Sequence, residues 1–416
     1  MSRVYSLLMT AAQPLLRRKL RRRGVSEPGY LHNVEERFGH YEGTTEPGRL
    51  WLHAVSLGET RAAAILMQAL RERQPDLRFL LTHGTATGRE QGQALLREGD
   101  AQAWLPWDTP DAVRRFLAHF RPSAGILIET EVWPNIAALC AEQGIPLALA
   151  NARLSEKSLS RARKLPGLSR RAYGSLRAVW AQTETDARRL AEAGATVKGV
   201  YGNLKFDATP DPALLRQGRE WHAASAAPVV MFASSREGEE TDFLAALRSH
   251  PGVQWMLVPR HPQRFDEVAA QVVQAGFTAS RRSTWADAPA PGDVWFGDSL
   301  GEMPLYYGMS DVALLGGSFA PLGGQNLIEA AACGCPVVMG PHTFNFGEAA
   351  ALALEAGAAR RVATLEEGVA RAVAWARDPG ARRRAAEAGE AFAAAHRGAA
   401  DQTAEAVLAL LATGRT

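Results

Sequence analysis

The chain has 416 residues, of which 46% are hydrophobic and 22% are charged, the balance of an ordinary globular protein. This composition excludes a disordered chain, a collagen-like fibre and a polytopic membrane protein, and the length predicts two domains. The 3 cysteines are too few for a disulfide framework in so long a chain, so we expect a reducing, cytoplasmic setting. Cys333 and Cys335 lack the spacing of a zinc knuckle, and we interpret them as small core residues.

The N-terminal segment, residues 1–23, differs from the rest of the chain in charge. It holds 7 basic residues and no acidic one, whereas the other 393 residues carry 40 basic and 44 acidic residues. Residues 4–16 are mostly apolar but fall short of the ~20 that a transmembrane helix needs, and the basic cluster follows them, unlike in a signal peptide. We interpret the segment as one that associates with an anionic membrane surface; a surface helix with a solvated charge run is the alternative. The mildly acidic remainder argues against a nucleic-acid partner.

From residue 48 on, short apolar runs alternate with segments in which apolar residues recur at helical spacing. The runs are residues 50–55, 77–82, 124–128, 145–150 and 178–182 in the first half, then 229–233, 254–258, 294–296, 312–315 and 336–339. Continuously apolar strands between helices indicate parallel sheets covered on both faces.

A turn-rich segment, residues 202–212, interrupts this pattern. We therefore predict two doubly wound α/β domains, residues 24–207 and residues 208–416, with one or two amphipathic helices within residues 378–411 closing the second. A ligand is expected in a cleft between the domains, at the carboxyl ends of the strands.

Several common catalytic motifs are absent from the sequence. It contains neither the P-loop pattern nor G-x-G-x-x-G, the usual signatures of phosphate and dinucleotide binding. Because H-E-x-x-H and Asp-x-Asp are missing too, no dedicated metal site is expected. The missing G-x-S-x-G argues against a hydrolase.

In the first half, acidic and basic residues follow the ends of predicted strands. Glu59 follows the first run and opens a helix, where it could act as a general base or merely complement the helix N-terminus. Glu129 and Glu131 follow the third run; capping of the next helix by one of them is the alternative to a functional role, and it fits Glu131 better. Lys205 could reach an anionic substrate, although an exposed linker lysine is the default interpretation.

In the second half, the residues at strand ends suit an anionic ligand. Arg260 directly follows a predicted strand, a position that suits phosphate recognition; an arginine in a surface ion pair is the alternative. Residues 316–329 run from a strand through a glycine-rich loop into a helix, and we expect their backbone N–H groups to form an anion site. Asn326 and Glu329 share one face of that helix, where a carboxylate could hold ribose hydroxyls.

The sequence closely resembles the bacterial 3-deoxy-D-manno-octulosonic acid (Kdo) transferase family, through the motifs HAVSLGE, IETEVWPN, ANARLS, GNLKFD, VPRHPQRF, GDSLGEM and GGQNLIEAAACGCPVVMGPHTFNF in this order. The resemblance covers about residues 30–346. It implies the two-domain GT-B glycosyltransferase fold and a location on the cytoplasmic face of the inner membrane. It also implies transfer of Kdo from CMP-Kdo to a lipid A precursor, lipid IVA, in lipopolysaccharide synthesis, without a cofactor.

The matching motifs imply a role for each candidate residue. Glu59 would be the general base, and Glu129 and Lys205 would stabilise the transition state. The residues implied at the CMP site are Pro259, Arg260, Leu300, Gly301, Glu302, Asn326, Leu327, Ile328 and Glu329. Because CMP leaves with a single phosphate, this chemistry requires no metal, in agreement with the missing Asp-x-Asp.

Two other functions compete with this interpretation. A nucleotide-sugar epimerase can use the same two-domain architecture, but it would not need the apolar and basic segment 1–23. A peripheral membrane protein with an inactive site is the non-enzymatic alternative. The presence of Glu59, Glu129, Lys205 and Arg260 together argues against it.

Overall fold

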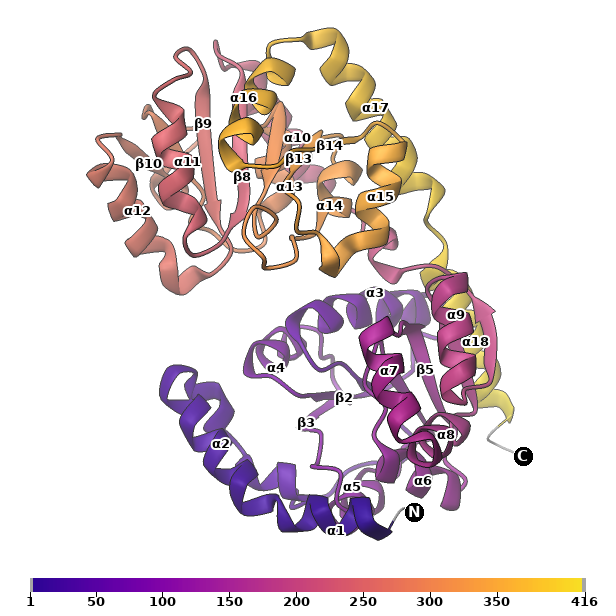
Figure 1. The fold of residues 1–416 in the computed structure, drawn as a ribbon. Coiled ribbons are helices and arrows are strands. Elements are labelled where there is room, and N and C mark those ends of the chain that lie inside the picture. The colour runs from indigo at the N-terminus through magenta and orange to yellow at the C-terminus, as the bar shows by residue number, and fades with distance from the viewer. Residues whose placement is uncertain (1–2, 414–416) are drawn as a thin grey trace. The chain divides into compact units, whose positions relative to one another are not determined.

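Two parallel sheets of seven strands each form the two units of the chain, in a computed structural model that describes residues 3–413 (Figure 1). The first unit comprises Met1–Asp207 together with Arg397–Thr416, and the second comprises Ala208–His396. The two units divide between Asp207 and Ala208, at the position where the sequence analysis places the boundary.

The sheet of the first unit has the strand order β3-β2-β1-β4-β5-β6-β7. The strands are β1 (Leu50–His53), β2 (Phe79–His83), β3 (Ala101–Trp104), β4 (Ala124–Ile128), β5 (Leu147–Ala152), β6 (Ala178–Ala181) and β7 (Val197–Val200). The helices are α3 (Leu57–Arg73), α4 (Ala86–Gln93), α5 (Pro110–Phe120), α6 (Pro134–Glu142), α7 (Glu156–Lys164), α8 (Pro166–Gly174), α9 (Glu184–Ala193) and α18 (Ala399–Thr413). The chain runs outward from β1 to β3 and returns to β4, so the strand order reverses between β1 and β4, where doubly wound folds bind their ligands.

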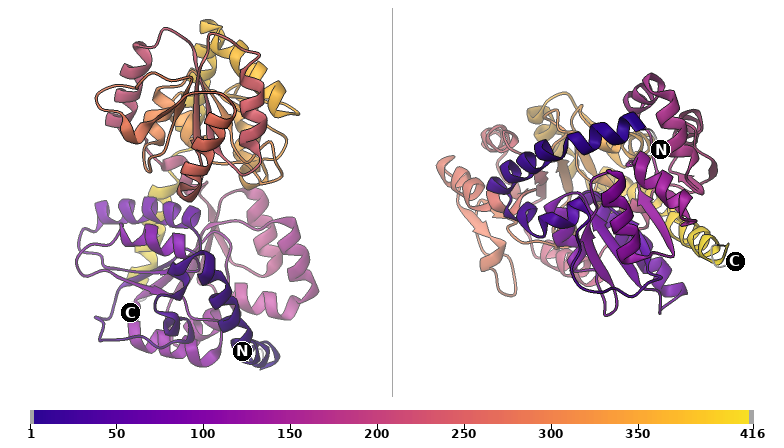
Figure 2. Two further views of the ribbon diagram at one scale, coloured as in Figure 1. Left: turned by 90° about the vertical axis from the view of Figure 1, so that its left-hand side faces the viewer. Right: turned by 90° about the horizontal axis from the view of Figure 1, so that it is seen from below.

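Helices cover both faces of this sheet, as the continuously apolar strands predict (Figure 2). One face packs against α3 and α18 through Leu66, Leu70 and Val407, and the other packs against α5 and α6 through Phe116 and Ile136. All five side chains are fully buried. Each contributes about 1.5–3 kcal/mol relative to an exposed position.

The sheet of the second unit has the order β10-β11-β9-β8-β12-β13-β14, which differs from the first in that β11 lies between β9 and the edge strand β10. The strands are β8 (Val229–Ser235), β9 (Gln254–Pro259), β10 (Ala279–Arg281), β11 (Val294–Phe296), β12 (Val312–Leu315), β13 (Val337–Met339) and β14 (Ala359–Arg361). The helices are α10 (Pro212–Ala223), α11 (Glu239–Leu247), α12 (Phe265–Gln274), α13 (Met303–Gly308), α14 (Leu327–Ala332), α15 (Gly347–Glu355), α16 (Leu365–Ala376) and α17 (Pro379–Ala395). Here the order reverses between β8 and β12.

The last helix corrects one prediction. α17 closes the second unit, but α18 packs against α3 in the first unit, so the second domain ends near residue 396 and not at residue 416. Asp207 explains part of this arrangement, because its carboxylate accepts hydrogen bonds from the backbone N–H groups of Gly398 and Ala400, at the start of α18. A local amphipathic pattern shows that a helix buries one face, but not which sheet receives it.

Two helices, α1 (Arg3–Ala11) and α2 (Gln13–Ser26), form the N-terminal segment and pack on the first unit. The Ser6 hydroxyl donates a 2.8 Å hydrogen bond to the Asn135 side chain, and Leu20 is buried. Arg17 pairs with Glu35 at 2.6 Å. Within residues 3–413, none of the helices is both long enough and apolar enough to cross a membrane.

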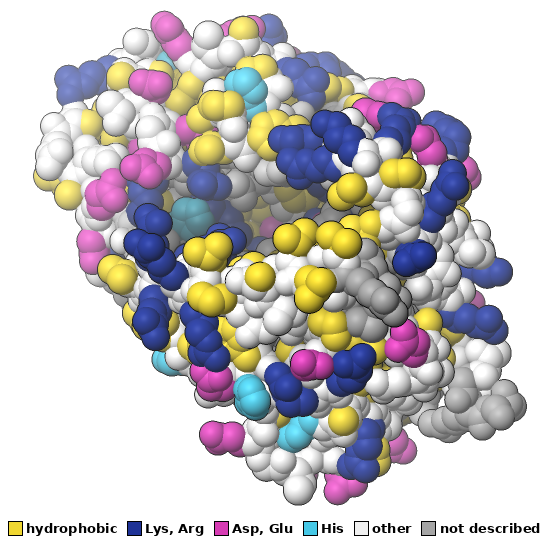
Figure 3. Space-filling view, turned by 60° about the horizontal axis from the view of Figure 1, so that its bottom comes forward, with side chains coloured by type: hydrophobic (Ala, Val, Ile, Leu, Met, Phe, Trp, Pro, Cys, Tyr) yellow, Lys and Arg dark blue, Asp and Glu magenta, His cyan; other side chains and the backbone are white. Residues whose placement is uncertain are grey.

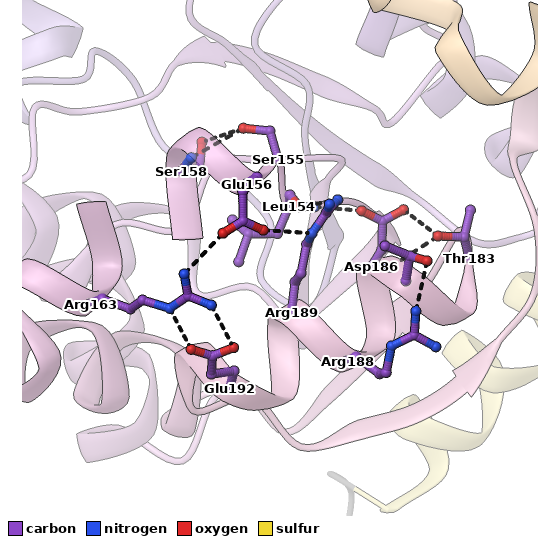
Figure 4. A network of polar contacts seen from close by, with 11 residues as sticks. Leu154, Ser155, Glu156, Ser158, Arg163, Thr183, Asp186, Arg188, Arg189 and Glu192 are labelled. Carbon is purple, nitrogen blue, oxygen red and sulfur yellow. Dashed lines mark hydrogen bonds and ion pairs between the residues drawn. The ribbon is translucent and has the colours of Figure 1, made fainter. Parts of the chain in front are cut away.

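A network of polar contacts joins α7 to α9 (Figure 4). Arg163 pairs with Glu192 at 2.6 Å and with Glu156 at 2.9 Å, and Arg189 reaches Glu156 at 3.3 Å. These pairs are largely solvent-exposed, so they add little stability. They connect α7, which follows β5, with α9, which follows β6.

Candidate active site

The candidate residues of the first unit gather where the sheet reverses its strand order. Glu59 lies in the first turn of α3, after β1, and Glu129 directly follows β4, the neighbour of β1 in the sheet. Lys205 comes from a short 3₁₀ helix, Leu204–Asp207. Three segments far apart in sequence thus bring two carboxylates and one ammonium group together.

Glu59 has a structural role at the start of α3. It forms a capping box: its carboxylate accepts hydrogen bonds from the N–H groups of Val55 and Ser56, and its own N–H donates to the Ser56 hydroxyl. The alternative expected from sequence, complementation of a helix N-terminus, is therefore also true of this residue.

The protonation of Glu59 is strongly perturbed. Burial, followed by the nearby Glu129 carboxylate, raises the pKa of Glu59 from 4.5 to about 7, and the two backbone hydrogen bonds oppose this shift only in part. Its exposed fraction is 8%, which explains why loss of hydration dominates. A carboxyl with a pKa near 7 is suited to accept a proton at physiological pH.

Glu129 is held in a strained backbone conformation. Its φ of +66° lies in the left-handed region, which non-glycine residues seldom adopt. Its carboxylate accepts a 2.7 Å hydrogen bond from the Lys205 ammonium group and a longer one, 3.5 Å, from Asn151. Such strain clusters at functional sites, where surrounding contacts hold the backbone in place.

Asn151 is a residue of this site that the sequence analysis does not single out. It has a φ of +52°, and its side-chain oxygen accepts a hydrogen bond from the N–H of Leu204, beside Lys205. Asn151 therefore connects the Glu129 carboxylate to the segment that carries Lys205. The signal available in the sequence is one amide inside the otherwise apolar strand LALANA.

Glu131 does not join this cluster through a hydrogen bond. Its carboxylate accepts a 3.0 Å bond from the Trp133 indole, two residues away, and burial raises its pKa. This local contact fits the structural role expected for Glu131.

The candidate residues of the second unit follow the carboxyl ends of β9, β11 and β12. Pro259 ends β9, and the backbone N–H of Arg260 donates to the carbonyl of Ser235 at the end of β8. The Arg260 guanidinium donates a 3.2 Å hydrogen bond to Gln325, which lies in the glycine-rich loop. The structure thus brings Arg260 to this loop, and Gln325 is a contact that the sequence analysis does not identify.

Residues 300–302 form a turn before α13. Leu300 is 71% exposed, and Gly301 has a φ of +82° that favours glycine. The Glu302 carboxylate pairs with Arg282 at 2.8 Å and accepts a hydrogen bond from Ser299.

The glycine-rich loop differs from the expected anion site in one respect. The carboxylate of Glu239, in the first turn of α11, accepts hydrogen bonds from the backbone N–H groups of Gly317 (2.7 Å), Phe319 (3.2 Å) and Ala320 (3.2 Å). These N–H groups are therefore not available to a ligand, because the chain supplies its own anion. The sequence does not reveal this, since Glu239 lies about 80 positions before the loop.

The end of the loop carries the remaining candidates. Asn326 caps α14, with its side-chain oxygen accepting from the N–H of Ile328 at 3.2 Å. Leu327 and Ile328 are each 1% exposed, so their side chains belong to the core and only their backbone could meet a ligand. Glu329 lies in the first turn of α14 and is partly exposed.

Among residues 3–413, no group of three or more His, Cys, Asp or Glu side chains is arranged to hold a metal ion. Cys333 and Cys335 are buried, as expected of core residues.

Comparison with known proteins identifies the family. A curated 3-deoxy-D-manno-octulosonic acid transferase of Bordetella pertussis is 47% identical over 422 residues, which cover 97% of this chain and 98% of that protein. The chain belongs to the Kdo transferase family. The family model described as "3-Deoxy-D-manno-octulosonic-acid transferase (kdotransferase)" matches residues 32–208, and the Kdo transferase of Haemophilus influenzae is 33% identical over 89% of each chain. The protein is therefore a glycosyltransferase.

The fold is shared more widely than the family. A UDP-GlcNAc 2-epimerase from Neisseria meningitidis superposes with a TM-score of 0.56 at 14% identity, covering 88% of this Kdo transferase and 100% of the epimerase. At this identity the likeness concerns the GT-B-type fold alone, and it carries no information on activity.

Proposed function

We propose that this Kdo transferase moves Kdo from CMP-Kdo to a lipid A precursor, lipid IVA, with Glu59 as the general base. The observation that carries the proposal is the cluster of Glu59, Glu129 and Lys205 at the strand-order reversal of the first sheet. Membership of the Kdo transferase family supports the sugar that is transferred.

The proposed reaction is a single displacement. Glu59 removes the proton from an acceptor hydroxyl as its oxygen attacks the anomeric carbon of Kdo, and the bond from that carbon to the CMP phosphate breaks. Positive charge develops on the sugar ring, which the Glu129 carboxylate stabilises, while Lys205 pairs with that carboxylate. With its pKa raised to about 7, a substantial fraction of Glu59 is ionised near pH 7 and able to accept the proton.

We assign the CMP half of the donor to the second unit. Arg260 follows β9 and would neutralise the phosphate, and Glu329 would accept hydrogen bonds from the ribose hydroxyls. A single phosphate leaving group carries little charge, so we propose that no divalent metal is needed.

One experiment tests the transfer. Purified protein is incubated with CMP-Kdo and lipid IVA in detergent with EDTA, and the lipid is analysed by mass spectrometry. We expect a mass increase equal to one or more Kdo residues. An unchanged lipid would refute the proposal, and epimerisation of a nucleotide sugar in a parallel incubation would favour the epimerase alternative.

We further propose that α1 and the start of α2 bring the enzyme to the cytoplasmic face of the inner membrane. Val4, Leu7 and Leu8 of α1 and Leu15 of α2 are 65–70% exposed. The spacing of the first three places them on one face of α1, and exposed basic residues follow in α2. Hydrophobic and basic side chains lie side by side on the face of the molecule turned forward in Figure 3. Apolar side chains beside arginines suit a bilayer with anionic headgroups.

The membrane contact is tested without disturbing the fold. We expect the four-fold replacement of Val4, Leu7, Leu8 and Leu15 by serine to move the protein from sedimented anionic vesicles to the supernatant. Replacement of Leu165 and Val273, which are each 62% exposed elsewhere, serves as the control. Equal vesicle binding by the four-fold variant would refute the contact. Deleting residues 2–23 is less informative, because Leu20 is buried and Ser6 bonds to Asn135.

A further inference from the structure

Anion recognition in the second unit depends on side chains more than on the glycine-rich loop. Glu239 accepts four backbone N–H groups, those of Arg236, Gly317, Phe319 and Ala320, and is 3% exposed. It therefore binds the loop after β12 to the loop after β8. With these donors engaged, cationic side chains are the other groups at these strand ends that can meet a negatively charged ligand.

Two arginines approach the glycine-rich loop from neighbouring strands. Arg260, after β9, donates to the side-chain oxygen of Gln325. Arg236, after β8, lies over Gly317: a Cβ placed on this glycine would be 3.4 Å from Cγ of Arg236 and 3.2 Å from the side-chain nitrogen of Gln325. Both arginines thus lie close to the same amide side chain.

The guanidinium of Arg236 forms no ion pair among the residues that the structure describes, although the Glu239 carboxylate accepts its backbone N–H. The side chain of Arg236 is partly buried. The neighbouring Arg264, by contrast, pairs with Glu240 and Glu267. Positive potential also shows at His261, whose pKa is lowered by burial and then by Arg236, Arg260 and Arg264.

The backbone around Arg236 is fixed in an unusual conformation. Ser234 has a φ of +56°, and any side chain at Gly316 would collide with the Ser234 carbonyl. The N–H of Arg236 is held by Glu239 at 3.0 Å. The strained conformation of Ser234 therefore helps to set the position of Arg236, and strain of this kind clusters at functional sites.

A donor that couples a nucleoside monophosphate to an octulosonic acid carries two anions, the phosphate and the sugar carboxylate. We propose that Arg236 binds the sugar carboxylate of the donor while Arg260 binds the phosphate. This inference rests on the proposed function, and it makes Arg236 the residue that distinguishes an acidic sugar from a neutral one. A guanidinium group suits this role because its planar donors match the two oxygens of a carboxylate.

The test compares the complete donor with its nucleotide part. KM for CMP-Kdo and the inhibition constant of CMP are measured for the wild type, Arg236→Gln and Arg236→Lys. We expect Arg236→Gln to raise KM at least about tenfold, the loss of one charge-assisted contact, and to leave the inhibition constant of CMP within about twofold. Arg236→Lys should recover part of the affinity. Arg371→Gln, which removes an exposed charge from α16, should change neither quantity.

Two results would overturn the assignment. An unchanged KM in Arg236→Gln, in a variant whose thermal unfolding matches the wild type, would show that Arg236 does not contact the donor. A parallel rise in KM and in the CMP inhibition constant would assign Arg236 to the nucleotide instead. Absence of transfer by the wild type would refute the proposed function together with this inference, whereas the first two results leave the proposed function intact.

Discussion

Replacement of Glu59 by glutamine should make the enzyme inactive and, above neutral pH, more stable. In the folded protein the pKa of Glu59 is about 7, against an ordinary value of 4.5. The folded state therefore binds the proton more tightly than the unfolded chain. The stabilisation that this tighter proton binding gives the folded state is complete below pH 4.5 and is lost as the pH rises through about 7. One pKa unit corresponds to about 1.4 kcal/mol, so ionised Glu59 costs the fold about 3 kcal/mol at pH 8.5.

Glutamine keeps the shape and the acceptor oxygen of the capping box but does not ionise. We expect the free energy of unfolding of Glu59→Gln, relative to wild type, to rise by about 3 kcal/mol between pH 4.5 and pH 8.5. Denaturant titrations of both proteins at several pH values measure this difference. Glu184→Gln, at an exposed glutamate in the first turn of α9, is the matched control, for which the difference should vary little with pH.

The transfer activity of Glu59→Gln should fall, whereas its stability at high pH should rise. Removal of a general base typically costs 10²–10⁴-fold, so transfer by Glu59→Gln should fall by at least about a hundredfold with CMP binding unchanged. In the wild type, kcat/KM should rise with pH and level off above about 7, as Glu59 ionises. Glu131→Gln should cost much less activity. Near-normal turnover by a folded Glu59→Gln, or a stability difference independent of pH, would refute the argument.

Four other substitutions test the rest of the site. Glu129→Gln should lower the pKa of Glu59, because the Glu129 charge helps to raise it, and the acid limb of the rate profile should shift to lower pH; a shift to higher pH would contradict the electrostatics. Arg260→Ala should weaken CMP binding by about 1.5–3 kcal/mol in calorimetry, and Glu329→Ala should weaken it as well; unchanged affinity in both would reject the nucleotide site. Glu239→Gln should lower the free energy of unfolding by about 1–3 kcal/mol at pH 7, because an amide nitrogen then faces backbone N–H donors; an unchanged denaturation midpoint would oppose this role.

Position in the sheet separates the ten strands that the sequence predicts from the four that it does not predict. The apolar runs correspond to the central strands, whereas β3, β7, β10 and β14 are the edge strands of the two sheets. Along the edge strand β7 every residue is partly or fully exposed. A strand at an edge is not covered on both faces, so the continuous apolar run that marks a parallel strand is absent there.

The candidate site was predictable where the chemistry lies next to a strand end. Glu59 and Glu129 follow apolar runs, and parallel strands direct their carboxyl ends to one edge of the sheet. Asn151 and Glu239 were not predictable in this way, because their roles depend on backbone N–H groups and side chains 20–80 positions distant. A motif shows which residues are near in sequence, while these contacts depend on the completed fold.

The two units place a glutamate at the same topological position and use it differently. Glu59 follows β1 and Glu239 follows β8, the first strand of each sheet, and both lie in the first turn of the next helix. Glu239 accepts four backbone N–H groups from two loops, which makes it a structural anion. Glu59 accepts only two, both from its own turn, and has a second carboxylate nearby. Burial raises the pKa of both carboxyls, but Glu59 has fewer hydrogen-bond donors and a like charge nearby. We therefore expect Glu59, and not Glu239, to serve as a base, although the two occupy the same position in their units.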